Sequence, residues 1–152
     1  MPSLAYNDDD KNQKCHHYNA GDTVLNNTGN HIEQYLSEVK EAVSKDKYRL
    51  DRNSRRQDNI DLFLDYVIDE AKVKEIIMSL EVTDFSEVLQ NIHKGFEHEK
   101  LYVFGKNVIL LERNGSEEKS VSLYIKFNKL ENNFVIIISF HECKAPLSFF
   151  FK

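Results

Sequence analysis

Cysteine is scarce in this sequence, and its two cysteines, Cys15 and Cys143, lie far apart and form no CxxC motif. This spacing argues against a disulfide framework and a cysteine-based zinc site, because both need several closely spaced cysteines. Reduced thiols in a cytoplasmic protein are the favoured interpretation, and a single disulfide is the alternative. His16 and His17 adjoin Cys15 without a second ligand pair at suitable spacing, so we expect no metal and no other cofactor.

Long apolar segments are also missing. No run approaches the roughly 20 apolar residues that span a bilayer, and the N-terminus lacks the basic-then-apolar pattern of a secretory signal peptide. We therefore expect a cytoplasmic protein with no membrane partner. The 152 residues, of which 41% are hydrophobic, suit one domain with one core.

Positive charge is in the minority, since the formal net charge is −5. This balance argues against a protein that coats nucleic acid through bulk charge. From residue 93 to the end, however, the chain has nine lysines and arginines and seven acidic residues. The acidity therefore lies upstream, and the C-terminal part can carry a local basic site.

The N-terminal part of the chain has helical patterns. Residues 1–30 have no apolar period and are rich in Asn, Asp and Gly, so we expect a disordered tail there and a single domain over 31–152. Apolar residues recur at helical spacing over 31–45 and 58–80. A third, short helix is expected from Asp84 as N-cap with Glu87 three residues on, and Gly95 as its C-terminal glycine.

After Gly95 the pattern changes to that of strands, expected over 101–104, 108–113, 121–130, 134–142 and 147–151. Gly105-Lys106-Asn107, Asn114-Gly115 and Asn132-Asn133 supply the expected turns. Helices followed by strands predict an α+β fold, with two to three N-terminal helices packed on one face of an antiparallel β-meander.

The last two strands form the most informative pair. Adjacent Asn residues tolerate the positive φ angles of a two-residue type I′ turn, so Asn132-Asn133 predicts a hairpin. In that register Tyr124 lies opposite His141, and Lys126 lies opposite Ser139. Alternation sends the apolar residues to the other face: Leu123, Ile125, Phe127, Phe134, Ile136, Ile138 and Phe140.

The polar face of this hairpin has the groups that metal-free RNA cleavage needs, namely a base, an acid and a cation. His141 titrates near neutral pH, Tyr124 can donate a proton, and Lys126 or Lys144 can hold phosphate oxygens. His98 is a second candidate acid–base group if its loop reaches the hairpin. An ordinary cross-strand Tyr124–His141 pair and a plain surface His98 are the alternatives.

The basic segment from Arg52 to Arg56 has two interpretations as well. It is a solvated stretch, or it is a loop that contacts phosphate or a partner protein.

Several short stretches occur in a characteristic order. They are Tyr35-Leu36-Ser37-Glu38-Val39-Lys40, Ile76-Ile77-Met78-Ser79-Leu80 running into Thr83-Asp84-Phe85, Leu123-Tyr124-Ile125-Lys126-Phe127, and Val135-Ile136-Ile137-Ile138-Ser139-Phe140. In this order, over residues 35–144, the chain resembles the MqsR-type toxin family of bacterial mRNA interferases, which have a RelE-like α+β fold.

The resemblance implies ribosome-independent cleavage of single-stranded mRNA and neutralisation by a cognate antitoxin protein. Tyr124 matches the family's catalytic tyrosine, whereas His141 stands where the family has a catalytic lysine. Glu87 corresponds to a further family lysine, and the family's catalytic glutamine has no clear counterpart near residues 98–102.

Together these observations predict a toxin endoribonuclease that works without metal. Tyr124, His141 and His98 are its expected catalytic residues, and Lys126 and Lys144 its expected substrate-binding residues. A non-catalytic protein-binding module of the same fold is the alternative. A metal-dependent nuclease gains little support from the scattered carboxylates.

Overall fold

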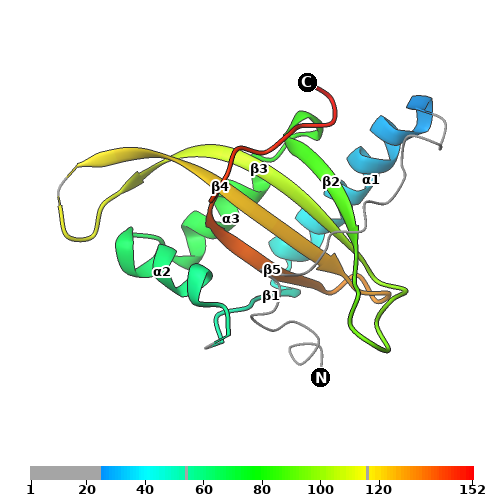
Figure 1. The fold of residues 1–152 in the computed structure, drawn as a ribbon, viewed down its shortest axis with the longest axis horizontal. Coiled ribbons are helices and arrows are strands. Elements are labelled where there is room, and N and C mark those ends of the chain that lie inside the picture. The colour runs from blue at the N-terminus through cyan, green and yellow to red at the C-terminus, as the bar shows by residue number, and fades with distance from the viewer. Residues whose placement is uncertain (1–24, 54, 116) are drawn as a thin grey trace.

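The computed structural model describes residues 25–53, 55–115 and 117–152, where the chain forms helices and one five-stranded sheet (Figure 1). The predicted α+β class is thereby confirmed. Within these ranges, no helix has the length and apolarity that crossing a membrane requires.

The sheet has the strand order β1-β5-β4-β3-β2. Its strands are β1 (Tyr48–Leu50), β2 (Phe85–Gln90), β3 (Lys100–Leu111), β4 (Glu118–Lys129) and β5 (Val135–Glu142). Strands β2 to β5 are antiparallel neighbours, but β1 pairs with β5 in parallel. The prediction of a purely antiparallel meander is therefore wrong, because a three-residue strand is too short to show an alternating pattern.

Three helices, α1 (Leu25–Ser44), α2 (Gln57–Asp65) and α3 (Glu70–Met78), pack on one face of the sheet. Their buried apolar side chains form one core with inward-facing residues of the strands. Each fully buried aliphatic or Phe side chain contributes about 1.5–3 kcal/mol. The largest fully buried side chains of this core are Ile32, Ile77, Leu80, Phe85, Phe104, Leu110, Leu123, Ile125, Phe127 and Phe140.

Helix α1 begins at Leu25 rather than near residue 31, so residues 25–30 of the expected tail are helical. The rest of that tail, with Cys15, His16 and His17, lies outside the described residues.

The predicted helix over 58–80 is wrong, because the chain forms α2 and α3 with a break between them. Tyr66 has an extended backbone, with φ −129° and ψ 153°, and bridges to Glu112 just after β3. Asp69 then starts α3 by accepting a hydrogen bond from Lys72 N at 2.8 Å. No Gly or Pro marks the break, so the pairing with the end of β3 and the N-cap at Asp69 account for it.

The predicted third helix is also wrong, since these residues form strand β2. Asp84 caps a short 3₁₀ turn, η4 (Val82–Asp84), by accepting from Glu81 N at 2.8 Å, and it accepts from Lys106 Nζ at 3.1 Å. The following residues pair with β3, and both faces of the strand are buried, Phe85 on the helix side and Leu89 on the other. Burial on both faces removes the alternation by which a strand is recognised.

The hairpin between β4 and β5 closes with a three-residue loop, not with the predicted two-residue turn. Leu130 N donates to Phe134 O at 2.8 Å, and Asn133 has φ +66°. This loop moves the register by one residue near the turn. A β-bulge then restores the predicted register further from the turn. It lies opposite Lys126 and Phe127, and Ile138 is the extra residue of β5.

The bulge changes which residues share a face. Leu123, Ile125, Phe127 and Phe140 face the helices, as predicted. Phe134, Ile136 and Ile138, which were predicted to join them, lie in a second apolar cluster on the opposite face, beside Tyr124. The polar groups of the hairpin are therefore next to a second apolar surface.

Gly105 lies within β3, opposite Tyr124, so the predicted turn at Gly105-Lys106-Asn107 is wrong. The C-terminal segment, residues 143–152, passes over this glycine (red in Figure 1). It does not form the predicted strand over 147–151; Phe150 N donates to Phe85 O at 3.1 Å, and Ser86 Oγ donates to Ser148 O at 2.6 Å. The absence of a side chain at Gly105 permits this close crossing.

We expect Gly105→Ala to lower the free energy of unfolding by about 1–3 kcal/mol, the usual cost of overpacking. The added Cβ would lie 2.6 Å from Leu147 Cδ1 and 3.0 Å from Phe149 Cζ. Urea denaturation measures the effect, and Leu147→Ala in the same chain should recover part of it.

Gly29→Ala is the matched control, because its Cβ would meet nothing nearer than Phe151 at 3.9 Å. In helix α1 this change should stabilise the protein by about 0.5–1 kcal/mol. Equal effects of the two substitutions would show that the crossing at Gly105 is not tight.

Candidate active site

Tyr124 and His141 lie directly opposite each other on β4 and β5, which confirms the predicted register at this point. Their rings stack with centroids 5.2 Å apart and an angle of 10° between the planes. Lys126 and Ser139 form the next opposed pair on the same face, also as predicted. The two strands thus place a phenol, an imidazole and an ammonium on one rigid surface.

The bulge beside this pair is held by Asn59 of α2, whose side chain is 1% exposed. Its Nδ2 donates to Ile138 O at 2.9 Å and to Asp51 O at 2.7 Å, and its Oδ1 accepts from Phe140 N at 2.8 Å. Sequence reasoning missed this residue. Asn59 gives hydrogen-bond partners to backbone groups on both sides of Ser139, and so fixes the part of β5 that presents His141.

The environment of His141 favours its neutral form. Burial lowers the pKa of the imidazole below its ordinary value of 6.5, and the nearby Lys126 and Lys144 act in the same direction. The hydrogen bond to Glu142 O and the charge of Asp58 oppose this shift, but burial is the largest effect. A carbonyl can only accept, so Nδ1 carries the proton in its 2.9 Å contact with Glu142 O, and Nε2 of the neutral ring keeps its lone pair.

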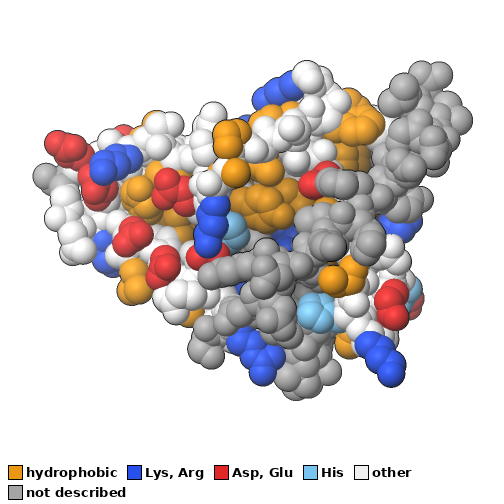
Figure 2. Space-filling model, in the orientation of Figure 1, with side chains coloured by type: hydrophobic (Ala, Val, Ile, Leu, Met, Phe, Trp, Pro, Cys, Tyr) orange, Lys and Arg blue, Asp and Glu red, His pale blue; other side chains and the backbone are white. Residues whose placement is uncertain are grey.

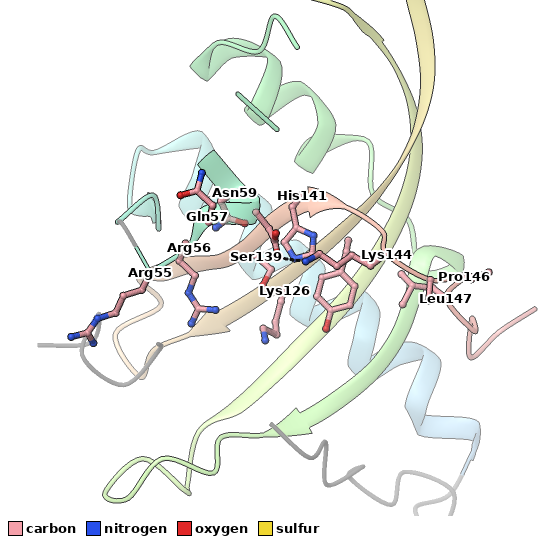
Figure 3. Close-up of a pocket in the computed structure, with 13 residues that line it drawn as sticks. Arg55, Arg56, Gln57, Asn59, Lys126, Ser139, His141, Lys144, Pro146 and Leu147 are labelled. Atoms are coloured by element: carbon pink, nitrogen blue, oxygen red, sulfur yellow. Dashed lines mark ion pairs between the residues drawn. The ribbon is translucent and has the colours of Figure 1, made fainter. Parts of the chain in front are cut away.

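Tyr124 and His141 line a cavity of about 410 Å³ (Figure 3). The described residues that line it include four cationic side chains, Arg55, Arg56, Lys126 and Lys144, and one carboxylate, Asp58. Figure 2, which views the molecule in the same orientation as Figure 1, shows histidine and basic side chains beside apolar ones on this face of the molecule. The cavity therefore suits an anionic ligand.

The two predicted substrate-binding lysines differ in their surroundings. Lys126 is 4% exposed on β4, whereas Lys144 is exposed at the start of the C-terminal segment. Lys144 Nζ forms an ion pair with Asp58 Oδ2 at 2.8 Å (dashed line in Figure 3). Lys126 is thus the deeper cation, and the charge of Lys144 is partly offset.

Arg55 and Arg56 complete the cavity from the loop before α2. The basic segment from Arg52 to Arg56 indicated these residues in the sequence, because a loop that contacts phosphate was one of the two interpretations of that segment. The pattern alone did not indicate that this loop meets the β4–β5 hairpin.

His98 lies elsewhere. It is an exposed residue in the loop between β2 and β3 and lines a different cavity, of about 500 Å³, together with His31 and Tyr102. In that cavity His31 Nε2 is 2.7 Å from the Tyr102 hydroxyl. The structure therefore brings together Tyr124, His141, Lys126 and Lys144, but not His98.

Glu87, which the family resemblance placed on a helix, lies half-buried on strand β2 opposite Val103.

Cys143 is a free thiol, and burial, followed by the charge of Glu142, raises its pKa. A raised pKa disfavours the nucleophilic thiolate form. No group of three or more His, Cys, Asp or Glu side chains that could hold a metal ion occurs in the described part of the chain.

Comparisons with family models, with curated proteins and with solved structures find no match to this chain.

Proposed function

We propose that this protein is a RelE-like endoribonuclease toxin, which cleaves single-stranded mRNA by metal-independent acid–base catalysis and is neutralised by a cognate antitoxin. The observation that carries the proposal is the stacked Tyr124–His141 pair beside a cavity lined by cationic side chains. The resemblance of residues 35–144 to MqsR-type toxins supports the biological role.

His141 is the general base in this proposal. Its lowered pKa keeps the ring neutral at pH 7, and Nε2 carries the lone pair that accepts a proton. It takes the proton of the ribose 2′-hydroxyl, and the 2′-oxygen attacks the adjacent phosphorus. A positioned base of this kind typically contributes about 10²–10⁴-fold to the rate.

Tyr124 is the general acid. Its hydroxyl donates a proton to the departing 5′-oxygen as the P–O5′ bond breaks, which leaves a 2′,3′-cyclic phosphate and a 5′-hydroxyl end. Lys126 stabilises the negative charge that develops on the phosphorane oxygens. Single-stranded RNA suits this site, because unstacked nucleotides can enter a cavity between strand and loop.

The proposal predicts that the purified protein cleaves an mRNA transcript in EDTA and leaves 2′,3′-cyclic phosphate ends. The same sequence made as DNA should stay intact, because it lacks the attacking hydroxyl. Tyr124→Phe should reduce the cleavage rate by about 10²–10⁴-fold, since the acid is removed. Gel electrophoresis measures the cleavage rate, and mass spectrometry of the products identifies the 2′,3′-cyclic phosphate ends.

Tyr48→Phe is the matched control, because Tyr48 lies on β1 and its hydroxyl donates to Glu70 at 3.0 Å, away from the cavity. It should cleave like the wild type. Cleavage that disappears in EDTA would contradict the metal-independent mechanism. RNA left intact under all conditions, together with stable capture of a protein partner, would favour the non-catalytic binding module.

A further inference from the structure

We infer that Arg56 binds the non-bridging oxygens of the scissile phosphodiester, with Asp51 as its positioning residue. This inference rests on the proposed function, because it names the group that holds the phosphate at the same site. It assigns a role to a residue outside the hairpin that carries Tyr124 and His141.

The burial of Arg56 is the first observation. Its side chain is 7% exposed, and that of Lys126 is 4% exposed, although both line the cavity. Figure 3 shows the two side chains extending in the same direction from neighbouring elements, the loop before α2 and strand β4. Two buried cations therefore lie on the wall of one cavity, where their low exposure to water leaves their attraction for an anion weakly screened.

The anchoring of Arg56 is the second observation. Asp51 Oδ2 lies 3.7 Å from Arg56 Nε, an ion pair that is too long for a hydrogen bond. Asp51 is itself fixed, because its Oδ1 accepts from Asn53 Nδ2 at 2.6 Å and its backbone oxygen accepts from Asn59 at 2.7 Å. The backbone N of Arg56 donates to Asn53 O at 2.8 Å. The guanidinium is thus held by the same network that fixes the β5 bulge.

The chemistry of Arg56 and Lys126 favours a phosphate group as the ligand. A guanidinium offers parallel N–H donors that match two oxygens of one phosphate group, whereas a lysine ammonium acts as a point charge. The phosphorane carries more negative charge on these oxygens than the bound substrate does. Arg56 beside Lys126 therefore stabilises the transition state more than the ground state.

The test uses RNA in which sulfur replaces one non-bridging oxygen at the cleavage site, prepared as separate stereoisomers. Sulfur accepts hydrogen bonds more weakly than oxygen, so the wild type should cleave one isomer more slowly than the all-oxygen strand. In Arg56→Ala the ratio of the all-oxygen rate to the sulfur-substituted rate should fall toward one, because the donor to that oxygen is gone. The kcat for the all-oxygen RNA should drop by about 10²–10³-fold. Arg56→Lys should show intermediate values, and Asp51→Asn should lower kcat and reduce the ratio with little change in KM.

Arg52→Ala is the control, since Arg52 belongs to the same arginine run but stacks over the Phe63 ring at 5.0 Å and lines another cavity. It should keep both the rate and the sulfur effect of the wild type. Because the ratio compares two substrates on one enzyme preparation, partial unfolding of a variant does not change it.

The outcomes separate the two proposals. If His141→Gln abolishes cleavage while Arg56→Ala retains the full sulfur effect, Arg56 does not bind the phosphate and the endoribonuclease assignment stands. If wild-type protein cleaves no RNA, both proposals are wrong. Loss of the sulfur effect in Arg56→Ala, together with its retention in Arg52→Ala, supports the inference.

Discussion

Replacing His141 by Gln should reduce RNA cleavage by about 10²–10⁴-fold, the usual contribution of a general base. Gln fills similar space and can form hydrogen bonds, but it cannot take up a proton. The initial rate of cleavage of an RNA oligonucleotide under saturating conditions measures the loss. KM should change little, because the phosphate ligands are kept.

The matched control is His98→Gln, which changes the histidine that lies in the other cavity. It should cleave RNA at the wild-type rate. A larger loss in His98→Gln than in His141→Gln would mean that the active site lies near the β2–β3 loop.

The pH dependence of the wild-type rate follows from the same assignment. A base works in its unprotonated form, so kcat/KM should rise with pH and then level off. Because burial lowers the pKa of His141, the midpoint of the rise should lie below the ordinary imidazole value of 6.5. A rate that instead falls as pH increases through this range would identify His141 as the acid.

Asn59→Leu should lower the free energy of unfolding by about 3–9 kcal/mol. The substitution removes three hydrogen bonds and leaves the buried backbone groups Asp51 O, Ile138 O and Phe140 N without their partner. Each such group costs about 1–3 kcal/mol when it is left unsatisfied. Urea denaturation monitored by circular dichroism measures the change.

Asn107→Leu is the control for this prediction. Asn107 is an exposed residue on β3, and its Oδ1 accepts from the exposed Ser122 hydroxyl at 2.7 Å. Its replacement should change stability by no more than about 0.5 kcal/mol, as is usual for surface positions. A similarly small effect of Asn59→Leu would show that the bulge does not depend on this amide.

The candidate site was predicted from the sequence in part, and by a partly wrong route. The pairing of Tyr124 with His141 assumed a two-residue turn at Asn132-Asn133. The chain forms a three-residue loop, and the bulge at Ile138 compensates for it. The register of the polar pair was therefore right, whereas the faces assigned to Phe134, Ile136 and Ile138 were wrong.

The other components of the site could not be predicted, because they come from a different part of the chain. Asn59 and Arg56 lie about 80 residues before β5, and no periodicity links them to the hairpin. His98 shows the converse, since its position before β3 suggested proximity to the hairpin that the fold does not provide.

By itself, the sequence determined the α+β class, helix α1 and the two strands that carry Tyr124, Lys126 and His141, because local apolar periodicity dictates these elements. Only the tertiary structure decided the break between α2 and α3, the strand character of β2, the bulge in β5 and the meeting of the arginine loop with the hairpin. Each of these depends on hydrogen bonds and burial between segments far apart in the chain, which compete with local preference and leave no periodic trace in it.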